Sequence, residues 1–253
     1  MSETQANPFW KDIIFWTAVG TVVAILGFLL NVQSIFLPRN VPLSPEERLH
    51  RATSGVPFFD SSKSAATQNA SWGTTWDTSP NEKGSCQLKD GGYAATSILE
   101  NTVKVCRSNI VRSDFALTVQ MTILKGDTGG IIFHWDQQPG DYHNFYYFYI
   151  EMDGSYGLYK SERQNCPGDQ CILPLFSSPP DQALKQGLGV PNDISLVVQG
   201  STFYLYGNGQ FLGDVPDNDT PYHQGYIGLA SGFGPGEAVF SNAKIWDTTS
   251  GSS

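Results

Sequence analysis

The chain has 253 residues, 40% of them hydrophobic, and a formal net charge of −9 at pH 7. An acidic chain without a basic cluster repels polyanions, so nucleic acid and anionic lipid are excluded as favoured partners. The about 190 residues at positions 57–247 are enough to bury one hydrophobic core, which favours a single domain.

The first feature along the chain is an apolar run. A short tail, residues 1–12, precedes eighteen residues, 13–30, that include no charged side chain. Together with its weakly polar continuation, the run from Ile13 to Leu37 is long enough to cross a bilayer core of about 30 Å as a helix. It has no basic leader and no small-x-small cleavage pattern, so a retained anchor is favoured over a signal peptide. A transmembrane helix at 13–37 is therefore predicted.

The charges that flank this run give conflicting evidence on orientation. Only Lys11 precedes it, whereas Arg39, Arg48 and Arg51 follow it, and the positive-inside rule would then place the rest of the chain in the cytoplasm. Long domains, however, are translocated largely regardless of charge. The cysteines favour the opposite orientation.

The chain has four cysteines, all of them downstream of the anchor: Cys86, Cys106, Cys166 and Cys171. An even set confined to one domain is typical of disulfides formed in an oxidising compartment. Cys166 and Cys171 bracket a short loop, which leaves Cys86 and Cys106 as the second pair. Four buried thiols or a zinc site are the alternatives, but the spacing from Cys86 to Cys106 matches no zinc knuckle. Two disulfides and an extracytoplasmic domain in a single-pass cell-membrane protein are favoured.

Residues 38–56 are polar and interrupted by proline, which predicts a linker with at most one helical turn, and residues 248–253 form a disordered tail. Between them, 57–247 is β-like throughout. Residues 114–124 alternate strictly between apolar and polar, with Phe115, Leu117 and Val119 on one face. An Asp153-Gly154 pair between two β-like runs predicts a type I′ hairpin turn. Further strands are expected at 130–135, 144–152, 194–200, 202–208, 225–232 and 237–246.

Short strands joined by hairpin turns predict an all-β fold, an antiparallel β-sandwich of the jelly-roll kind, preceded by one transmembrane α-helix. The runs DFALTVQMTILKGDTGGIIFHWD, YYFYIEMDGSYGLY and GYIGLASGFGPGEAVFSNAKIWD resemble the concanavalin A-like, laminin-G-like sandwich superfamily. The likeness is to bacterial domains related to family 16 glycoside hydrolases and 3-keto-disaccharide hydrolases. It covers about residues 58–247 and implies a fold rather than an activity.

The family 16 type of glycosidase carries Glu-x-Asp-x-(x)-Glu on one strand. This chain matches only Glu151-Met152-Asp153, without the second Glu, and Asp153 is better explained by the turn. Asp136 and His134 lie near one loop with His143, where a carboxylate and an imidazole could bind Ca²⁺ or transfer protons, although no metal motif supports this. No catalytic residue and no cofactor is therefore predicted, and Glu151, Asp136 and His134 remain weak candidates.

Alternation also predicts a binding face. If Phe133, Phe148 and Ile150 face the core, several polar and aromatic side chains face outward on one sheet. These are His134, Tyr147, Tyr149, Glu151, Gln199, Tyr204 and Tyr206. Aromatic rings mixed with hydrogen-bonding groups suit sugars and other small ligands. Tyrosine is also favoured on any half-exposed sheet, and a register error of one residue exchanges the two faces.

The sequence therefore predicts a membrane-anchored extracytoplasmic recognition domain that binds a glycan or a cell-surface protein. A glycoside-processing hydrolase and a structural envelope protein without a ligand are the alternatives.

Overall fold

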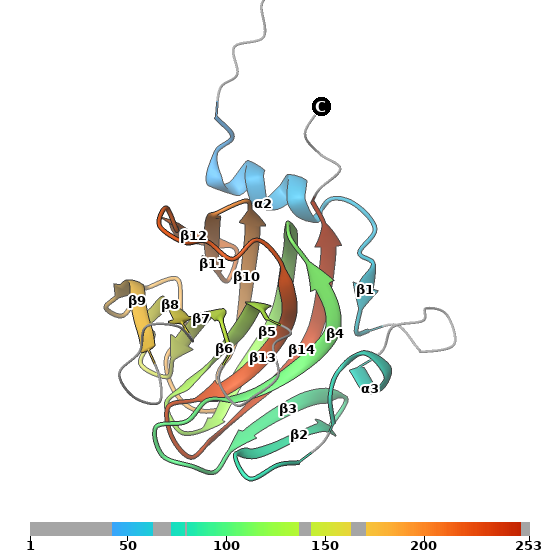
Figure 1. Ribbon diagram of the computed structural model, residues 1–253, viewed down its shortest axis with the longest axis vertical. Coiled ribbons are helices and arrows are strands. Elements are labelled where there is room, and N and C mark those ends of the chain that lie inside the picture. The colour runs from blue at the N-terminus through green and yellow to red at the C-terminus, as the bar shows by residue number, and fades with distance from the viewer. Residues whose placement is uncertain (1–41, 63–71, 79, 137–142, 163–170, 249–253) are drawn as a thin grey trace, which may run out of the picture. The chain divides into compact units, whose positions relative to one another are not determined.

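The computed structural model describes residues 42–62, 72–78, 80–136, 143–162 and 171–248. The predicted anchor lies outside these ranges. Among the residues that are described, no helix is both long and apolar enough to cross a membrane. From Leu43 onward the chain forms one compact unit (Figure 1).

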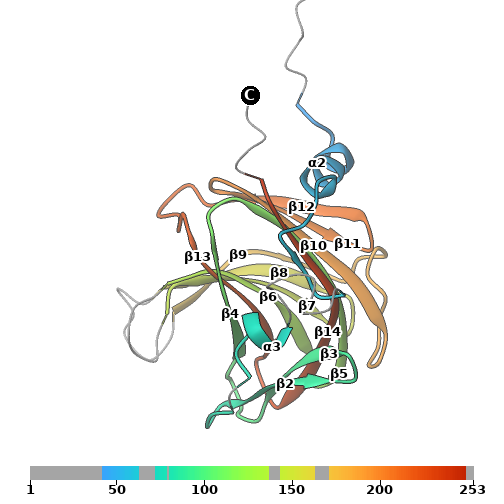
Figure 2. The ribbon, with the colours of Figure 1, turned by 90° about the vertical axis from the view of Figure 1, so that its right-hand side faces the viewer.

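Within the described residues the strands form two sheets, one of eight and one of six, and every strand pair is antiparallel. The larger sheet runs in the order β12 (Gln210–Pro216), β11 (Thr202–Gly207), β10 (Pro191–Gln199), β5 (Phe115–Lys125), β14 (Gly236–Asp247), β3 (Gly92–Ser97), β2 (Gly84–Lys89), and β1 (Phe59–Asp60) also pairs with β14. The smaller sheet runs β4 (Lys104–Arg112), β13 (Gly225–Gly232), β6 (Thr128–Trp135), β7 (Phe145–Glu151), β8 (Tyr156–Glu162), β9 (Cys171–Ser178). The two sheets form facing layers (Figure 2), which confirms the predicted antiparallel sandwich.

The core lies between the sheets and follows the alternation of the strands. In β5, Phe115, Leu117 and Val119 are each at most 2% exposed and belong to this core, as predicted. Phe133, from β6, and Phe203, from β11, pack edge to face with centroids 5.0 Å apart. Because successive residues of a strand point to opposite sides, these inward positions determine which side chains lie on the two outer faces.

A disulfide joins the two sheets. Cys86 in β2 and Cys106 in β4 are bonded, with Cα atoms 5.6 Å apart, and both are fully buried. The predicted pairing of these two cysteines is confirmed. Cys166 lies outside the described residues, so its predicted bond to Cys171 stays a prediction.

The predicted linker contains a nine-residue helix, α2 (Pro45–Thr53), longer than the single turn expected. Ser44 caps it, because its hydroxyl accepts from the amide of Glu47 while the Glu47 carboxylate accepts from the amide of Ser44. Leu49 and Ala52 pack against a small apolar cluster on the outer face of the larger sheet. A second, four-residue helix, α3 (Trp72–Thr75), precedes β2.

Candidate functional site

The outer face of the smaller sheet carries an aromatic cluster, defined here as Tyr147, Tyr149, Tyr159 and Phe233. Tyr149 and Tyr159 stack, with centroids 4.6 Å apart and planes at 9°. Phe233 lies across them, 5.6 Å from Tyr159 at 81° and 5.8 Å from Tyr147. Tyr147 and Tyr149 are 1% and 4% exposed, whereas Tyr159 and Phe233 are partly exposed. The two outer rings therefore present aromatic surface to solvent, and the two inner rings support them.

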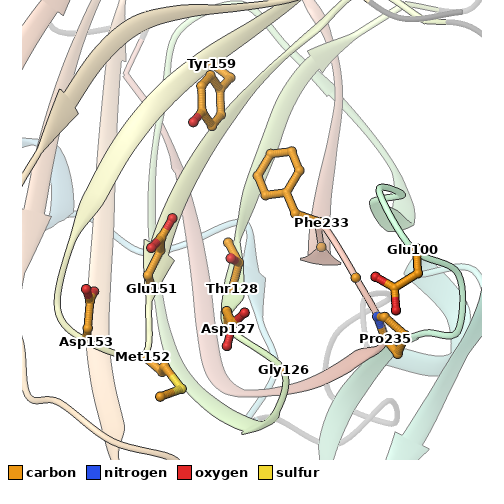
Figure 3. A pocket seen from close by; sticks show the side chains of 12 residues that line it. Glu100, Gly126, Asp127, Thr128, Glu151, Met152, Asp153, Tyr159, Phe233 and Pro235 are labelled. Atoms are coloured by element: carbon orange, nitrogen blue, oxygen red, sulfur yellow. The ribbon is translucent and has the colours of Figure 1, made fainter.

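Beside this cluster lies a pocket of about 680 Å³, called the acidic pocket below (Figure 3). Turns at one end of the sandwich supply much of its wall. Its lining residues are Glu100, Gly126, Asp127, Thr128, Glu151, Met152, Asp153, Tyr159, Gly232, Phe233, Gly234 and Pro235. Glu151 and Thr128 face Phe233 across the pocket, with Tyr159 at one end and Glu100 on the far side (Figure 3). Aromatic surface and hydrogen-bonding carboxylates thus line the same space.

The β7–β8 turn positions two of these carboxylates. Glu151 donates its amide to Ser155 O at 2.8 Å, and Gly154 donates to Glu151 O at 3.0 Å. Gly154 has φ +89°, whereas Asp153 is not among the residues with positive φ. Type I′ geometry needs positive φ at both central residues, so the predicted type I′ turn is wrong. The loop has three residues, with glycine in the left-handed position, and Asp153 accepts from the amide of Ser155.

Phe233 owes its position to a glycine-flanked turn. It lies between Gly232 and Gly234 and has φ +65°, a left-handed conformation that costs a non-glycine residue on the order of 1 kcal/mol. Packing against the tyrosines of the aromatic cluster offsets this cost. Such a conformation is a common feature of binding sites.

Glu151 is the pocket carboxylate whose pKa is raised. Burial raises the pKa of Glu151, and the neighbouring carboxylates of Asp153 and Asp127 raise it further, against a weak hydrogen bond from Ser155. Tyr147, in the aromatic cluster, has a buried hydroxyl without a hydrogen-bond partner in the described part of the chain. Burial first, then the Glu151 charge, raises the pKa of Tyr147.

His134 does not belong to this face, and the prediction that it points outward is wrong. It has φ +51° at a register irregularity where β6 pairs with β13. Its ring is 1% exposed and contacts the core rings of Phe133, Tyr146 and Phe203. Its Nε2 lies 2.8 Å from Ser113 O. Desolvation by burial lowers the pKa of His134, so the imidazole is neutral.

Asp136 lies at the other end of the β6–β7 hairpin from Glu151. Its Oδ1 lies 3.0 Å from His143 Nδ1, and its Oδ2 accepts from the amide of Asn144. Thr128 pairs with Glu151 at one end of the hairpin, while Asp136 follows β6 at the other. Seven residues at about 3.3 Å per residue separate the two ends of the hairpin by roughly 20 Å. The two catalytic carboxyl groups of a glycosidase lie within about 10 Å of each other. The three weak catalytic candidates are not brought together.

The remaining predicted ligand residues lie on the larger sheet, so the expectation of a single face is wrong. Gln199, Tyr204 and Tyr206 point outward there and contact α2, which leaves Tyr206 buried, Tyr204 partly exposed and Gln199 exposed. Arg48 donates to Gln199 Oε1 at 2.5 Å and places its guanidinium 4.0 Å from the Tyr204 ring. Tyr206 donates its hydroxyl to Pro45 O at 2.8 Å. These three residues hold a helix in this structure.

Sequence reasoning missed Tyr159, Phe233, Glu100 and Asp127. A correct register for β8 would have found Tyr159, and the Gly-Phe-Gly pattern at 232–234 marks a loop-borne aromatic ring. In the described ranges no group of three or more His, Cys, Asp or Glu side chains is arranged to hold a metal ion.

No protein-family model and no curated protein matches this chain. Solved structures of similar fold include a protein of unknown function with a galectin-like fold from Bacillus subtilis, 12% identical, covering 68% of this chain and 89% of that one, TM-score 0.50. Others are the carbohydrate-binding module CBM66 from Bacillus subtilis (16% identical, 68% and 96% covered, TM-score 0.49) and a Bacillus licheniformis β-glucanase (10% identical, 69% and 92% covered, TM-score 0.45).

At these identities the likeness concerns the fold alone. The chain is a two-sheet antiparallel sandwich, and its fold is similar to the galectin-like fold of that Bacillus subtilis protein.

Proposed function

We propose that this protein recognises glycans through the acidic pocket. The observation that carries the proposal is the pairing of two partly exposed rings, Tyr159 and Phe233, with carboxylates of the same pocket. The apolar C–H face of a pyranose stacks on aromatic rings, and carboxylates accept hydrogen bonds from its hydroxyl groups. The pocket volume of about 680 Å³ is in the range of small-ligand sites.

The proposal places the sandwich outside the cell membrane, anchored by the helix predicted at 13–37. The length and apolar character of that run support the anchor. The Cys86–Cys106 disulfide supports an oxidising compartment. A protein ligand on the cell surface and a purely structural role are the competing explanations.

A glycan array tests the proposal. The full-length chain is kept in a polyoxyethylene detergent, which carries neither sugar nor charge. Saturable binding to a related set of glycans is expected, with loss in the Tyr159→Ala variant. Tyr204→Ala is the matched control, since Tyr204 is a partly exposed tyrosine on the other sheet. Equal binding by both variants, or no binding by a folded wild-type chain, would overturn the proposal.

A second candidate, glycoside hydrolysis, is favoured by one observation. A carboxyl whose pKa is raised by burial and by neighbouring carboxylates is typical of a general acid, and Glu151 has this environment. Release of reducing ends from the glycans that bind, abolished in Glu151→Gln, would establish it. Stable glycans over a long incubation would contradict it.

A further inference from the structure

We infer that the acidic pocket takes a ligand with a protonated amine, an amino sugar rather than a neutral or anionic one. This inference rests on the proposed glycan-binding function and narrows its ligand class. Two independent features of the pocket carry it: the charge of its lining and the geometry of its aromatic rings.

The charge of the lining has one sign. Carboxylates come from Glu100, Asp127, Glu151 and Asp153, and none of the residues described around the pocket is Lys, Arg or His. A uronic acid or sulfated sugar would bring a further negative charge against these groups without a cation to offset it. An ammonium group instead offers three donors and a positive charge to a set of acceptors.

The two exposed rings provide surfaces that attract a cation. Tyr159 and Phe233 meet at 81° with centroids 5.6 Å apart, so their faces form two sides of a corner next to Glu151. Aromatic faces attract ammonium groups electrostatically, and more strongly when water is excluded. A neutral hydroxyl group has no such attraction to an aromatic face.

The test compares three tetrasaccharides by calorimetry on the full-length chain in polyoxyethylene detergent. They are β-1,4-linked glucosamine, which is cationic, its N-acetylated form, which is neutral with the same backbone, and galacturonate, which is anionic. The glucosamine tetramer is expected to bind at least about tenfold more tightly than the N-acetylated one, with no binding of galacturonate.

Two variants distinguish binding at the pocket from the non-specific attraction of an acidic protein for a polycation. Glu151→Gln is expected to weaken glucosamine binding about tenfold, whereas Glu46→Gln removes the same charge from exposed α2 on the other sheet and should leave it unchanged. Equal losses in both variants would overturn the inference.

The outcomes also separate this inference from the proposed function. If the N-acetylated tetramer binds equally well and Tyr159→Ala abolishes its binding, the pocket binds glycans but does not select an amine. If none of the three binds at the pocket and the array is also blank, both proposals fail.

Discussion

Tyr149 and Tyr159 stack face to face on the outer surface of the smaller sheet although only Tyr159 reaches solvent. Gly157, opposite Tyr149 on β8, makes the stack possible, because a Cβ there would lie 2.6 Å from the Tyr149 hydroxyl oxygen. The buried ring can therefore lie flat across β8 and fix the orientation of the exposed one. A ring held in one orientation loses little conformational entropy when a ligand binds.

Replacing Tyr159 by alanine is expected to abolish the aromatic wall and lower glycan affinity at least about tenfold. The variant should stay folded, since the ring is partly exposed and lies outside the inter-sheet core. Calorimetry measures the affinity and circular dichroism the fold. Unchanged affinity in a folded variant would remove Tyr159 from the site.

Glu151 predicts a pH dependence of stability. Its pKa in the folded chain is raised above the ordinary 4.5, so the folded state binds the proton more tightly than the unfolded state. Stability contributed by this group is then complete below pH 4.5 and is lost as the pH rises through the folded pKa. Glu151→Gln should therefore increase the stability relative to wild type more at pH 7 than at pH 4. Urea unfolding at both values measures the difference. An increase that is larger at pH 4 would contradict the raised pKa.

The Cys86–Cys106 bond closes a loop with a sequence separation of 20. The chain-entropy relation for a loop of this length gives about 3 kcal/mol of stabilisation. The Cys86→Ala, Cys106→Ala double variant should lose about that much free energy of unfolding in urea. Wild type measured with dithiothreitol is the control and should approach the variant. No loss in either experiment would show that the disulfide is not formed.

The contacts of α2 predict that the helix stabilises the domain. A fragment 52–253 lacks the packing of Leu49 and leaves the Tyr206 hydroxyl without Pro45 O. It should unfold about 2–3 kcal/mol more easily than 43–253. The two midpoints in urea measure this. Equal midpoints would mean that the helix does not pack on the sheet in solution.

Alternation could predict the sandwich because Phe115, Leu117 and Val119 alternate over a long strand with one buried face. It could not predict which strands share a sheet, since that depends on long-range pairing. The alternation pattern therefore predicts one surface for Tyr204 and Tyr147, although the two residues lie on different sheets. Nor did the pattern reveal α2, whose tertiary contacts stabilise a segment that is polar in sequence.

The turn type determined whether the site could be found. A two-residue turn at Asp153-Gly154 would pair Tyr147 with Lys160, and would place a lysine on the binding face. The actual three-residue loop pairs Tyr147 with Tyr159. Lys160 instead points inward, is 2% exposed, and lies 2.8 Å from the Asp217 carboxylate. A shift of one residue in the pairing of β7 with β8 therefore decides whether Tyr159 or Lys160 lies beside Tyr147 on the outer face.

The most direct test of the central claim is chemical-shift mapping of the ¹⁵N-labelled chain titrated with the glucosamine tetramer. We expect the perturbed amides to cluster at 126–128, 151–153 and 232–235, segments that line the acidic pocket. Perturbations confined to β10, β11 and α2 on the other face, or a titration that moves no amide, would contradict it.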